Sequence, residues 1–300
     1  MKSDQFQTQP SKAIRKGRCS VGNTMTGMSI SEMEEMARKC RVEICKMTHR
    51  AQAGHPGGSL SEIDILCGLY GHRLRAKPDD PDWEDRDRFI LSKGHASPGM
   101  YAVLAEMGFI SHEDLKSYRV KGGVCQGHVD MKWCPGVDFS AGSLGMGLSF
   151  GMGCAIAGRL SGSERNIFVM LGDGEIQEGS IWEAAMAAKH HELGNLKVIL
   201  DRNRIQNDDF CVTQMRMFDI PAKWESFGWD VMEIDGHNMD DVVRGLDFLV
   251  NNNDNPAILI ANTIKGKGVS FMEDNPAFHG AAPNDEQFKL AMNELGEVMS

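Results

Sequence analysis

The sequence of 300 residues lacks the features that mark several classes of protein. Its eight cysteines contain no CxxC pair, which argues against a zinc knuckle and a small disulfide scaffold and predicts reduced thiols. No apolar run reaches the roughly 18 residues of a membrane span, and the basic N-terminal segment has no apolar middle like that of a secretion signal. Basic residues do not cluster, and the net charge of -10 disfavours nucleic acid. We therefore expect a cytoplasmic protein without a membrane or nucleic-acid partner.

The composition instead fits one large globular domain. Hydrophobic residues make up 41% of the chain and charged residues 25%, which is typical of a protein that can bury a substantial core. A chain of this length is ordinary for a single α/β domain. We expect an irregular N-terminal extension over residues 1–28 and one domain over residues 29–300.

Apolar patterns predict that helices and strands alternate along the chain. We expect strands within residues 87–91, 166–171, 196–200, 229–235 and 257–264. Helices are predicted over Ser31–His49, Gln177–Glu192 and Met239–Asn251. Three other helices are predicted with one bound each: one begins near Ser59 or Ser61, another ends at Gly108, and the third begins near Ser143. Residues 166–200 form a right-handed βαβ unit, so we expect an α/β fold with a mostly parallel sheet and helices on both faces.

Two polar residues follow neighbouring strands of this predicted unit. Asp173 stands in the turn Gly172-Asp173-Gly174 after one strand, and Asn203 follows the next. Parallel strands end at the same edge of a sheet, where ligands of open α/β sheets bind, so we expect these side chains to be neighbours. Their oxygens suit magnesium or calcium, and the glycines allow phosphates to approach the backbone. Taken separately, Asp173 could merely cap a helix and Asn203 merely form a turn.

The same stretch resembles a known family. The GDG turn followed by Asn203 resembles the thiamine diphosphate signature, and "GDGEIQEGSIWEAAMAA" with "GNLKVILDRNRIQ" is similar to transketolases. The resemblance covers about Met33 to Pro283 and includes "AGHPGGSLSEIDIL", "DRFILSKGHA", "PGVDFSAGSLGMGLS", "DGHN" and "TIKGKGVSFMEDNPAFHGAAP". Transketolases ordinarily carry three domains, and only the first matches. The resemblance therefore implies the N-terminal, pyrophosphate-binding subunit of a split transketolase, with the pyrimidine-binding and C-terminal domains on a partner chain in an α2β2 assembly.

The resemblance also implies roles for individual residues. It assigns Mg2+ or Ca2+ to Asp173, Asn203 and the main-chain carbonyl of Ile205. It assigns thiamine diphosphate contacts to Gly142, Leu144, Gly172, Asp173, Gly174, Glu175, Glu178, Asn203 and Lys265, with Glu178 helping to link paired cofactor sites. Four histidines in glycine-rich loops match positions that contact the cofactor or move protons at the sugar: His55, His95, His128 and His279. The implied reaction transfers a two-carbon ketol unit from a ketose to an aldose.

Three departures from the family pattern leave the substrate open. Val129 follows His128 where proline is usual, Met146 stands where glutamine is common, and Phe278 replaces a frequent tryptophan. Whether the sugar is phosphorylated is not fixed by the sequence. Two other functions remain: the α subunit of a 2-oxoacid dehydrogenase, against which the histidine loops and "IKGKG" count, and a non-catalytic metal-nucleotide binding module. Because the glutamate that activates the cofactor lies on the missing domain, we expect the chain alone to bind cofactor weakly and turn over nothing.

Overall fold

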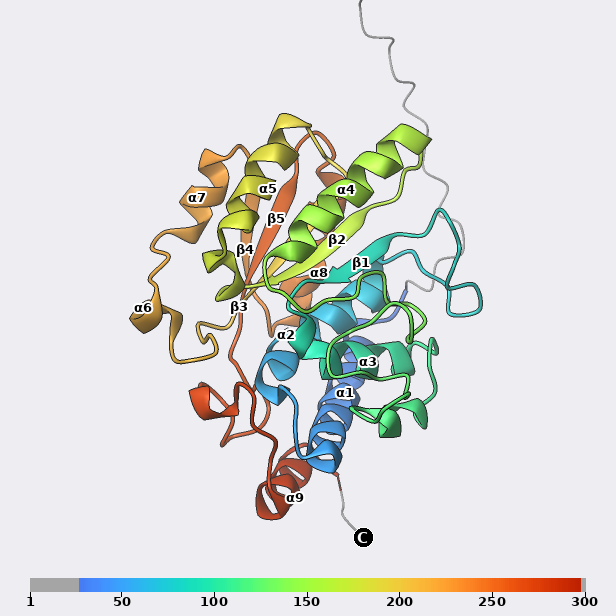
Figure 1. Cartoon of the computed structure of the whole chain (residues 1–300), viewed down its shortest axis with the longest axis vertical. Coiled ribbons are helices and arrows are strands. Elements are labelled where there is room, and N and C mark those ends of the chain that lie inside the picture. The colour runs from blue at the N-terminus through green and yellow to red at the C-terminus, as the bar shows by residue number, and fades with distance from the viewer. Residues whose placement is uncertain (1–26, 298–300) are drawn as a thin grey trace, which may run out of the picture.

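A parallel sheet forms the centre of the molecule in the computed structural model, which describes residues 27–297 (Figure 1). The sheet has five strands in the order β1-β2-β3-β5-β4, and every neighbouring pair is parallel. The strands are β1 (Arg88–Leu91), β2 (Ile167–Gly172), β3 (Leu196–Arg202), β4 (Asp230–Asp235) and β5 (Ala257–Asn262). This confirms the predicted α/β class. The predicted extension over residues 1–28 lies almost entirely outside the described residues.

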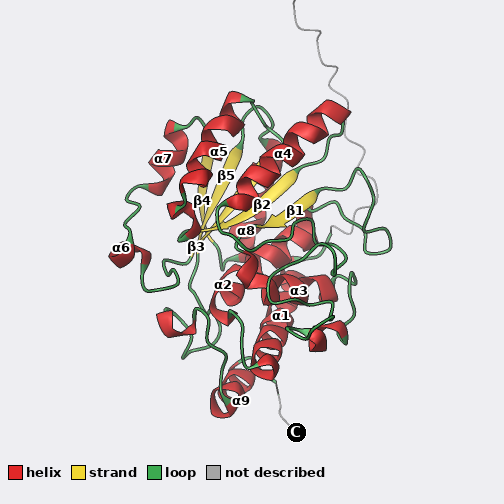
Figure 2. Ribbon diagram, viewed as in Figure 1, coloured by secondary structure: helices red, strands yellow, loops and turns green. Residues whose placement is uncertain are grey.

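Helices cover both faces of the sheet (Figure 2). One face is covered by α1 (Ile30–Ala51), α2 (Pro56–Gly68), α3 (Ser97–Glu106) and α8 (Met239–Asn251). The other face is covered by α4 (Met146–Ser161), α5 (Gly179–His190) and α7 (Ile220–Ser226). The remaining short elements are α6 (Cys211–Gln214), α9 (Asp285–Glu294), a π-helical turn at Leu69–Arg73 and 3-10 turns at Gly94–Ala96, Asp114–Ser117, Glu175–Gln177 and Pro276–Phe278.

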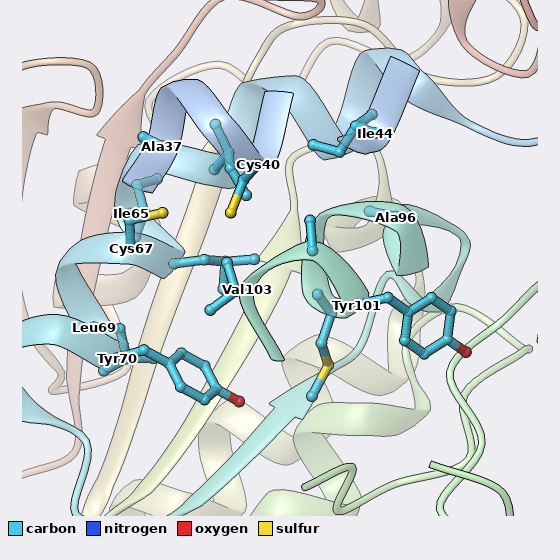
Figure 3. Close-up of a cluster of buried hydrophobic side chains, with 14 of the residues drawn as sticks. Ala37, Cys40, Ile44, Ile65, Cys67, Leu69, Tyr70, Ala96, Tyr101 and Val103 are labelled. Atoms are coloured by element: carbon cyan, nitrogen blue, oxygen red, sulfur yellow. The ribbon is translucent and has the colours of Figure 1, made fainter. Parts of the chain in front are cut away.

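Two hydrophobic cores result, one on each side of the sheet. Successive side chains of a strand point to opposite faces, so Phe168 and Met170 of β2 join the first core, whereas Val169 and Leu171 join the second. Figure 3 shows part of the first core, where side chains of α1, α2 and α3 meet. Because the central strands are buried on both faces, their sequences are continuous apolar runs rather than alternating ones.

The first helix illustrates how sequence fixes an element boundary. Ser29 caps α1, and Glu32 returns a hydrogen bond to the Ser29 backbone in a capping box. Met33, Ala37 and Cys40 then recur at three- and four-residue steps on the buried face. The helix extends slightly beyond the predicted Ser31–His49. Within residues 27–297, no helix is both long and apolar enough to cross a membrane.

Helix starts were the weakest part of the sequence prediction. The second helix begins at Pro56, not near Ser59 or Ser61, because proline suits a first helical turn and Gly57 packs tightly against the 276–279 turn. The helix predicted from near Ser143 begins at Met146, after Gly145 in a left-handed conformation with φ of 81°. The helix predicted from Gln177 begins at Gly179, after a 3-10 turn.

Candidate active site

Asp173 and Asn203 meet at the carboxyl edge of the sheet, as the sequence predicts. Gly172 of β2 pairs with Asp201 of β3, so the residues that follow the two strands emerge side by side. The backbone N–H of Arg204 donates to Asp173 Oδ2 at 2.7 Å, which ties the GDG turn to the loop after β3. Both side chains are buried, at 4% exposure. The edge therefore carries one carboxylate and one carboxamide.

A pocket of about 400 Å³ opens at this edge. All fourteen residues predicted to contact metal, cofactor or substrate line it: His55, His95, His128, Gly142, Leu144, Gly172, Asp173, Gly174, Glu175, Glu178, Asn203, Ile205, Lys265 and His279. They come from segments that are far apart in the sequence, between residues 55 and 279. The structure thus brings the whole predicted set together, while the role of each residue stays a prediction.

The four predicted histidines form one cluster at the pocket. Ring centroids lie 5.1 Å apart for His55 and His95, 5.5 Å for His55 and His279, and 6.4 Å for His55 and His128. Burial lowers the pKa of His55 to about 4 and that of His279 to about 3, with nearby positive charge adding to the effect. Burial also lowers the pKa values of His95 and His128. These imidazoles are therefore neutral near pH 7, in a state that can both accept and donate hydrogen bonds.

Lys265 reaches into the pocket from the loop after β5. Its Nζ donates to the main-chain oxygen of Ile205 at 2.8 Å and lies 2.7 Å from Nδ1 of His279. Burial, with the charge of Lys93 next in size, lowers the pKa of Lys265 to about 8. The lysine remains largely protonated at neutral pH, so it presents a buried positive charge beside the GDG turn.

The donor set at the GDG turn fits a hard divalent cation. Burial, followed by the charge of Asp201, raises the pKa of Asp173 to about 6, so a nearby cation would relieve an unfavourable charge. The described part of the chain contains no group of three or more His, Cys, Asp or Glu side chains that could hold a metal. A cation here would instead use the oxygens of Asp173, Asn203 and Ile205, a set that suits Mg2+ or Ca2+.

Glu175 lines the pocket, but its carboxylate bonds within the chain. Oε1 accepts hydrogen bonds from the Ser92 hydroxyl and from the Gly145 backbone N–H, the latter at 2.9 Å. Oε2 accepts from the Gly172 N–H at 3.1 Å. Glu175 therefore joins the loops that enclose the pocket, in addition to the cofactor contact predicted for it.

Lys93 is the main pocket residue that the sequence did not predict. Its Nζ lies 2.5 Å from Asp201 Oδ2 and 2.8 Å from Glu62 Oε2, and it also lines the pocket. Burial opposes ionisation of Asp201, but Lys93 and neighbouring hydrogen bonds outweigh burial and lower the pKa of Asp201. The only signal in the sequence was a lysine in the turn that directly follows a buried strand. Four further lining residues were also not predicted: Gly58, Gln177, Gln206 and Asn207.

Asp201 in turn orients Asn203. The amide nitrogen Nδ2 of Asn203 lies 2.9 Å from Asp201 Oδ2 and 3.1 Å from Ser61 Oγ. Because both contacts take the nitrogen, the carboxamide oxygen Oδ1 points away from them, toward the backbone N–H of Ile205 at 3.2 Å. The amide therefore presents its oxygen toward the loop after β3, at the proposed ligand Ile205.

Comparison with known proteins agrees with this geometry. Residues 32–298 match the family model described as "Transketolase, thiamine diphosphate binding domain". The chain is 38% identical over 270 residues to one subunit of the apulose-4-phosphate transketolase of Phocaeicola vulgatus, covering 90% of this chain and 96% of that protein. It is 39% identical over 242 residues to 6-deoxy-6-sulfo-D-fructose transketolase subunit SqwG of a Clostridium species, covering 81% of this chain and 88% of that protein.

Proteins named simply as transketolase match over less than half of their own length. The structure of transketolase from Campylobacter jejuni superimposes with a TM-score of 0.85 at 31% identity, covering 90% of this chain but 43% of that chain. Human transketolase is 35% identical over 252 residues, which is 40% of its length. The chain belongs to the transketolase family and corresponds to the N-terminal, thiamine diphosphate binding part of those enzymes.

Proposed function

We propose that this chain is the N-terminal subunit of a two-component transketolase, which transfers a two-carbon ketol unit from a ketose to an aldose. The observation that carries this proposal is the pocket in which the GDG turn, Asn203, Lys265 and the four histidines meet. The chain matches nearly the whole length of a protein named as a transketolase subunit, but only part of the length of human transketolase. This difference supports a division of the enzyme between two polypeptides.

In this proposal Mg2+, or Ca2+, would be held by Asp173, Asn203 and the carbonyl of Ile205, beside the diphosphate of the cofactor. Gly174 lets phosphate oxygens approach the backbone, and Lys265 supplies a positive charge beside them. Thiamine diphosphate, when bound, would supply the carbon nucleophile and the carbanion stabilisation needed to exchange the carbon–carbon bond next to the sugar carbonyl. One buried nitrogen, Nδ1 of His55, has no hydrogen-bond partner among the described residues, which fits a pocket shaped for a ligand.

The histidine cluster positions hydroxyl groups and moves protons. Lys265 donates to Nδ1 of His279, so the proton of this neutral ring resides on Nε2, where it can be donated in a hydrogen bond to a sugar oxygen. His55 packs against both His95 and His279, which places several neutral imidazoles within reach of one carbonyl. Because the rings are neutral at pH 7, each presents one nitrogen that can accept a hydrogen bond or a proton from a sugar hydroxyl and one that can donate a hydrogen bond.

A partner chain covers the rim of the pocket in this proposal. Leu144, Met146 and Phe150 expose 36%, 49% and 38% of their surface, although all three are apolar, and Leu144 lines the pocket itself. Glu178 is exposed at the same rim. Figure 1 shows α4 and α5 running side by side on this face. We assign this surface to the chain that carries the pyrimidine-binding domain, in an α2β2 assembly where Glu178 helps to link two sites.

The proposal is tested by purifying the chain alone and together with its candidate partner. We expect ketol transfer and tight thiamine diphosphate binding only from the complex, and loss of both when Asp173 is replaced by Ala. Sugars with a phosphate, a sulfonate or no charged group should be compared, because related proteins are named for phosphorylated and sulfonated sugars. Robust turnover by the isolated chain would refute the division between two chains. Decarboxylation of a 2-oxo acid in place of ketol transfer would favour the dehydrogenase alternative.

A further inference from the structure

The loop that carries Lys265 is bound, on the side away from the pocket, by a network of charged and polar side chains. His237, in the segment between β4 and α8, accepts a hydrogen bond at Nε2 from the backbone N–H of Ile264 at 2.8 Å. Its other ring nitrogen, Nδ1, lies 2.7 Å from Asp64 Oδ2 on α2. The ring therefore connects α2 to the residue directly before Lys265.

Arg41 of α1 completes the arrangement. Its two terminal nitrogens bind the two oxygens of Asp64 at 3.0 and 2.6 Å, and its Nε donates to the main-chain oxygen of Lys267 at 3.1 Å. Arg41 and His237 thus hold the 264–267 loop at both ends, one through a carbonyl and one through an N–H. The side chains of Arg41, Asp64 and His237 expose only 11%, 10% and 12% of their surface.

The hydrogen bonds fix the tautomer of His237. A backbone N–H can only donate, so Nε2 must be the acceptor and the ring proton must reside on Nδ1, where it faces Asp64. Burial opposes the charge of Asp64, but the contacts with His237 and Arg41 outweigh burial and lower the pKa of Asp64. Arg41 thereby keeps Asp64 ionised, and Asp64 keeps the proton of His237 on the side away from the loop.

The hydrogen bond that fixes the backbone of Ile264 also restrains the backbone of the next residue, Lys265. The side chain of Lys265 is nearly fully buried and ends at two pocket groups, the Ile205 carbonyl and the His279 ring. A long lysine side chain loses much rotamer freedom when it is held at one position, so its placement depends on the backbone from which it starts. His237 controls that backbone without lining the pocket.

We propose that His237, held by Asp64 and Arg41, is a positioning residue for thiamine diphosphate that acts through Lys265. This inference rests on the proposed function, because it takes the diphosphate as the ligand of Lys265. It gives a role to the DGHN motif, whose histidine does not line the cofactor pocket but has a largely buried side chain.

A double-mutant cycle tests the inference. In the complex with the partner subunit, the dissociation constant of thiamine diphosphate is measured by calorimetry for wild type, His237→Phe, Lys265→Met and the double variant. We expect His237→Phe to weaken binding about tenfold in the wild-type background, the lower end of the effect of residues that orient a ligand-binding group. It should weaken binding less than twofold when Lys265 is already Met, because interactions through a shared residue are not additive. His237→Gln, which can still accept and donate, should recover part of the affinity.

His72 provides the matched control. Its Nε2 lies 2.7 Å from Asp247 Oδ1, so His72→Phe also breaks a partly buried histidine-aspartate pair, but His72 does not line the pocket. This variant should lower the melting temperature without changing thiamine diphosphate affinity. Hydrogen exchange of residues 264–268 should accelerate in His237→Phe and not in His72→Phe.

Two results would overturn the inference: equal loss of affinity in the wild-type and Lys265→Met backgrounds, or unchanged exchange of residues 264–268 in His237→Phe. Either would leave His237 with a purely structural role. A different result, no thiamine diphosphate binding by the wild-type complex, would refute the proposed function itself. The exchange measurement separates these cases, because it reports on the loop with no cofactor present.

Discussion

Replacing Asp173 with Asn is expected to stabilise the metal-free protein at neutral pH, although it removes a proposed metal ligand. Asp173 is buried at 4% exposure and, within the described residues, forms no ion pair. An asparagine has nearly the same shape and can still accept the hydrogen bond from the Arg204 N–H at its oxygen. The substitution therefore removes a buried charge while keeping the packing.

The pKa of Asp173 sets the size of this effect. Burial, with Asp201 next, raises it from 3.8 to about 6, and each pH unit corresponds to about 1.4 kcal/mol. The folded protein holds this proton more tightly than the unfolded chain does, so stability falls as pH rises from about 4 to about 6. Above pH 6 the full cost of about 3 kcal/mol is present in the wild type and absent in Asp173→Asn.

Urea unfolding with a chelator present measures the difference directly. At pH 7.5 the variant should be more stable than wild type by up to about 3 kcal/mol, and the difference should shrink as pH falls toward 4. The exposed Asp254→Asn serves as a control and should change little. With Mg2+, thiamine diphosphate and the partner chain present, the order should reverse, because only wild type gains binding energy. If Asp173→Asn is less stable than wild type in chelator at pH 7.5, the buried-charge argument is wrong.

Three further predictions concern the same pocket. Ser61→Ala should weaken Mg2+ binding about tenfold, because Asn203 loses a partner that orients its amide. Competition with Mn2+, followed by electron paramagnetic resonance, measures this affinity, and an unchanged affinity would contradict the prediction. Gly174→Ala should lower both cofactor affinity and stability, because the Cβ of the new alanine would lie 2.6 Å from the Cβ of Gln206. Gly179→Ala is the control: a Cβ at this position would have no atom within 4 Å, so the substitution should change neither measurement. In the cofactor-free chain, NMR should show all four pocket histidines titrating below the usual pKa of 6.5, since burial lowers each value; titration at 6.5 or above would refute this.

The sequence was sufficient to predict the centre of the site because two strong signals coincide there. Continuous apolar runs identified β2 and β3 as buried strands, and the rule that parallel strands end at one edge placed Asp173 beside Asn203. The four histidines were located by family resemblance, since four glycine-rich loops carry no periodic pattern. Their convergence in one pocket depends on tertiary structure that local patterns do not encode.

The supporting contacts could not be predicted for the same reason. In the sequence, Asp201 has the pattern of the polar end of an ordinary strand. Its partners Lys93 and Ser61 lie more than a hundred residues away in sequence. His237 likewise has the sequence pattern of an ordinary loop histidine, and only the folded structure shows its contacts with Asp64 and Ile264. Helix starts failed for a different reason, since Pro56 begins a helix where glycines predict a break.

The buried charges of the pocket indicate what kind of ligand completes it. Lys93 and Asp201 already compensate each other at 2.5 Å, but Asp173 and Lys265 form no ion pair within residues 27–297. Burial biases both toward the neutral state, raising the pKa of Asp173 and lowering that of Lys265. A cation beside Asp173 and an anion beside Lys265 would each oppose that bias. A divalent metal bound to a diphosphate carries both charges on adjacent groups, so one ligand complex satisfies the two sites that the protein leaves uncompensated.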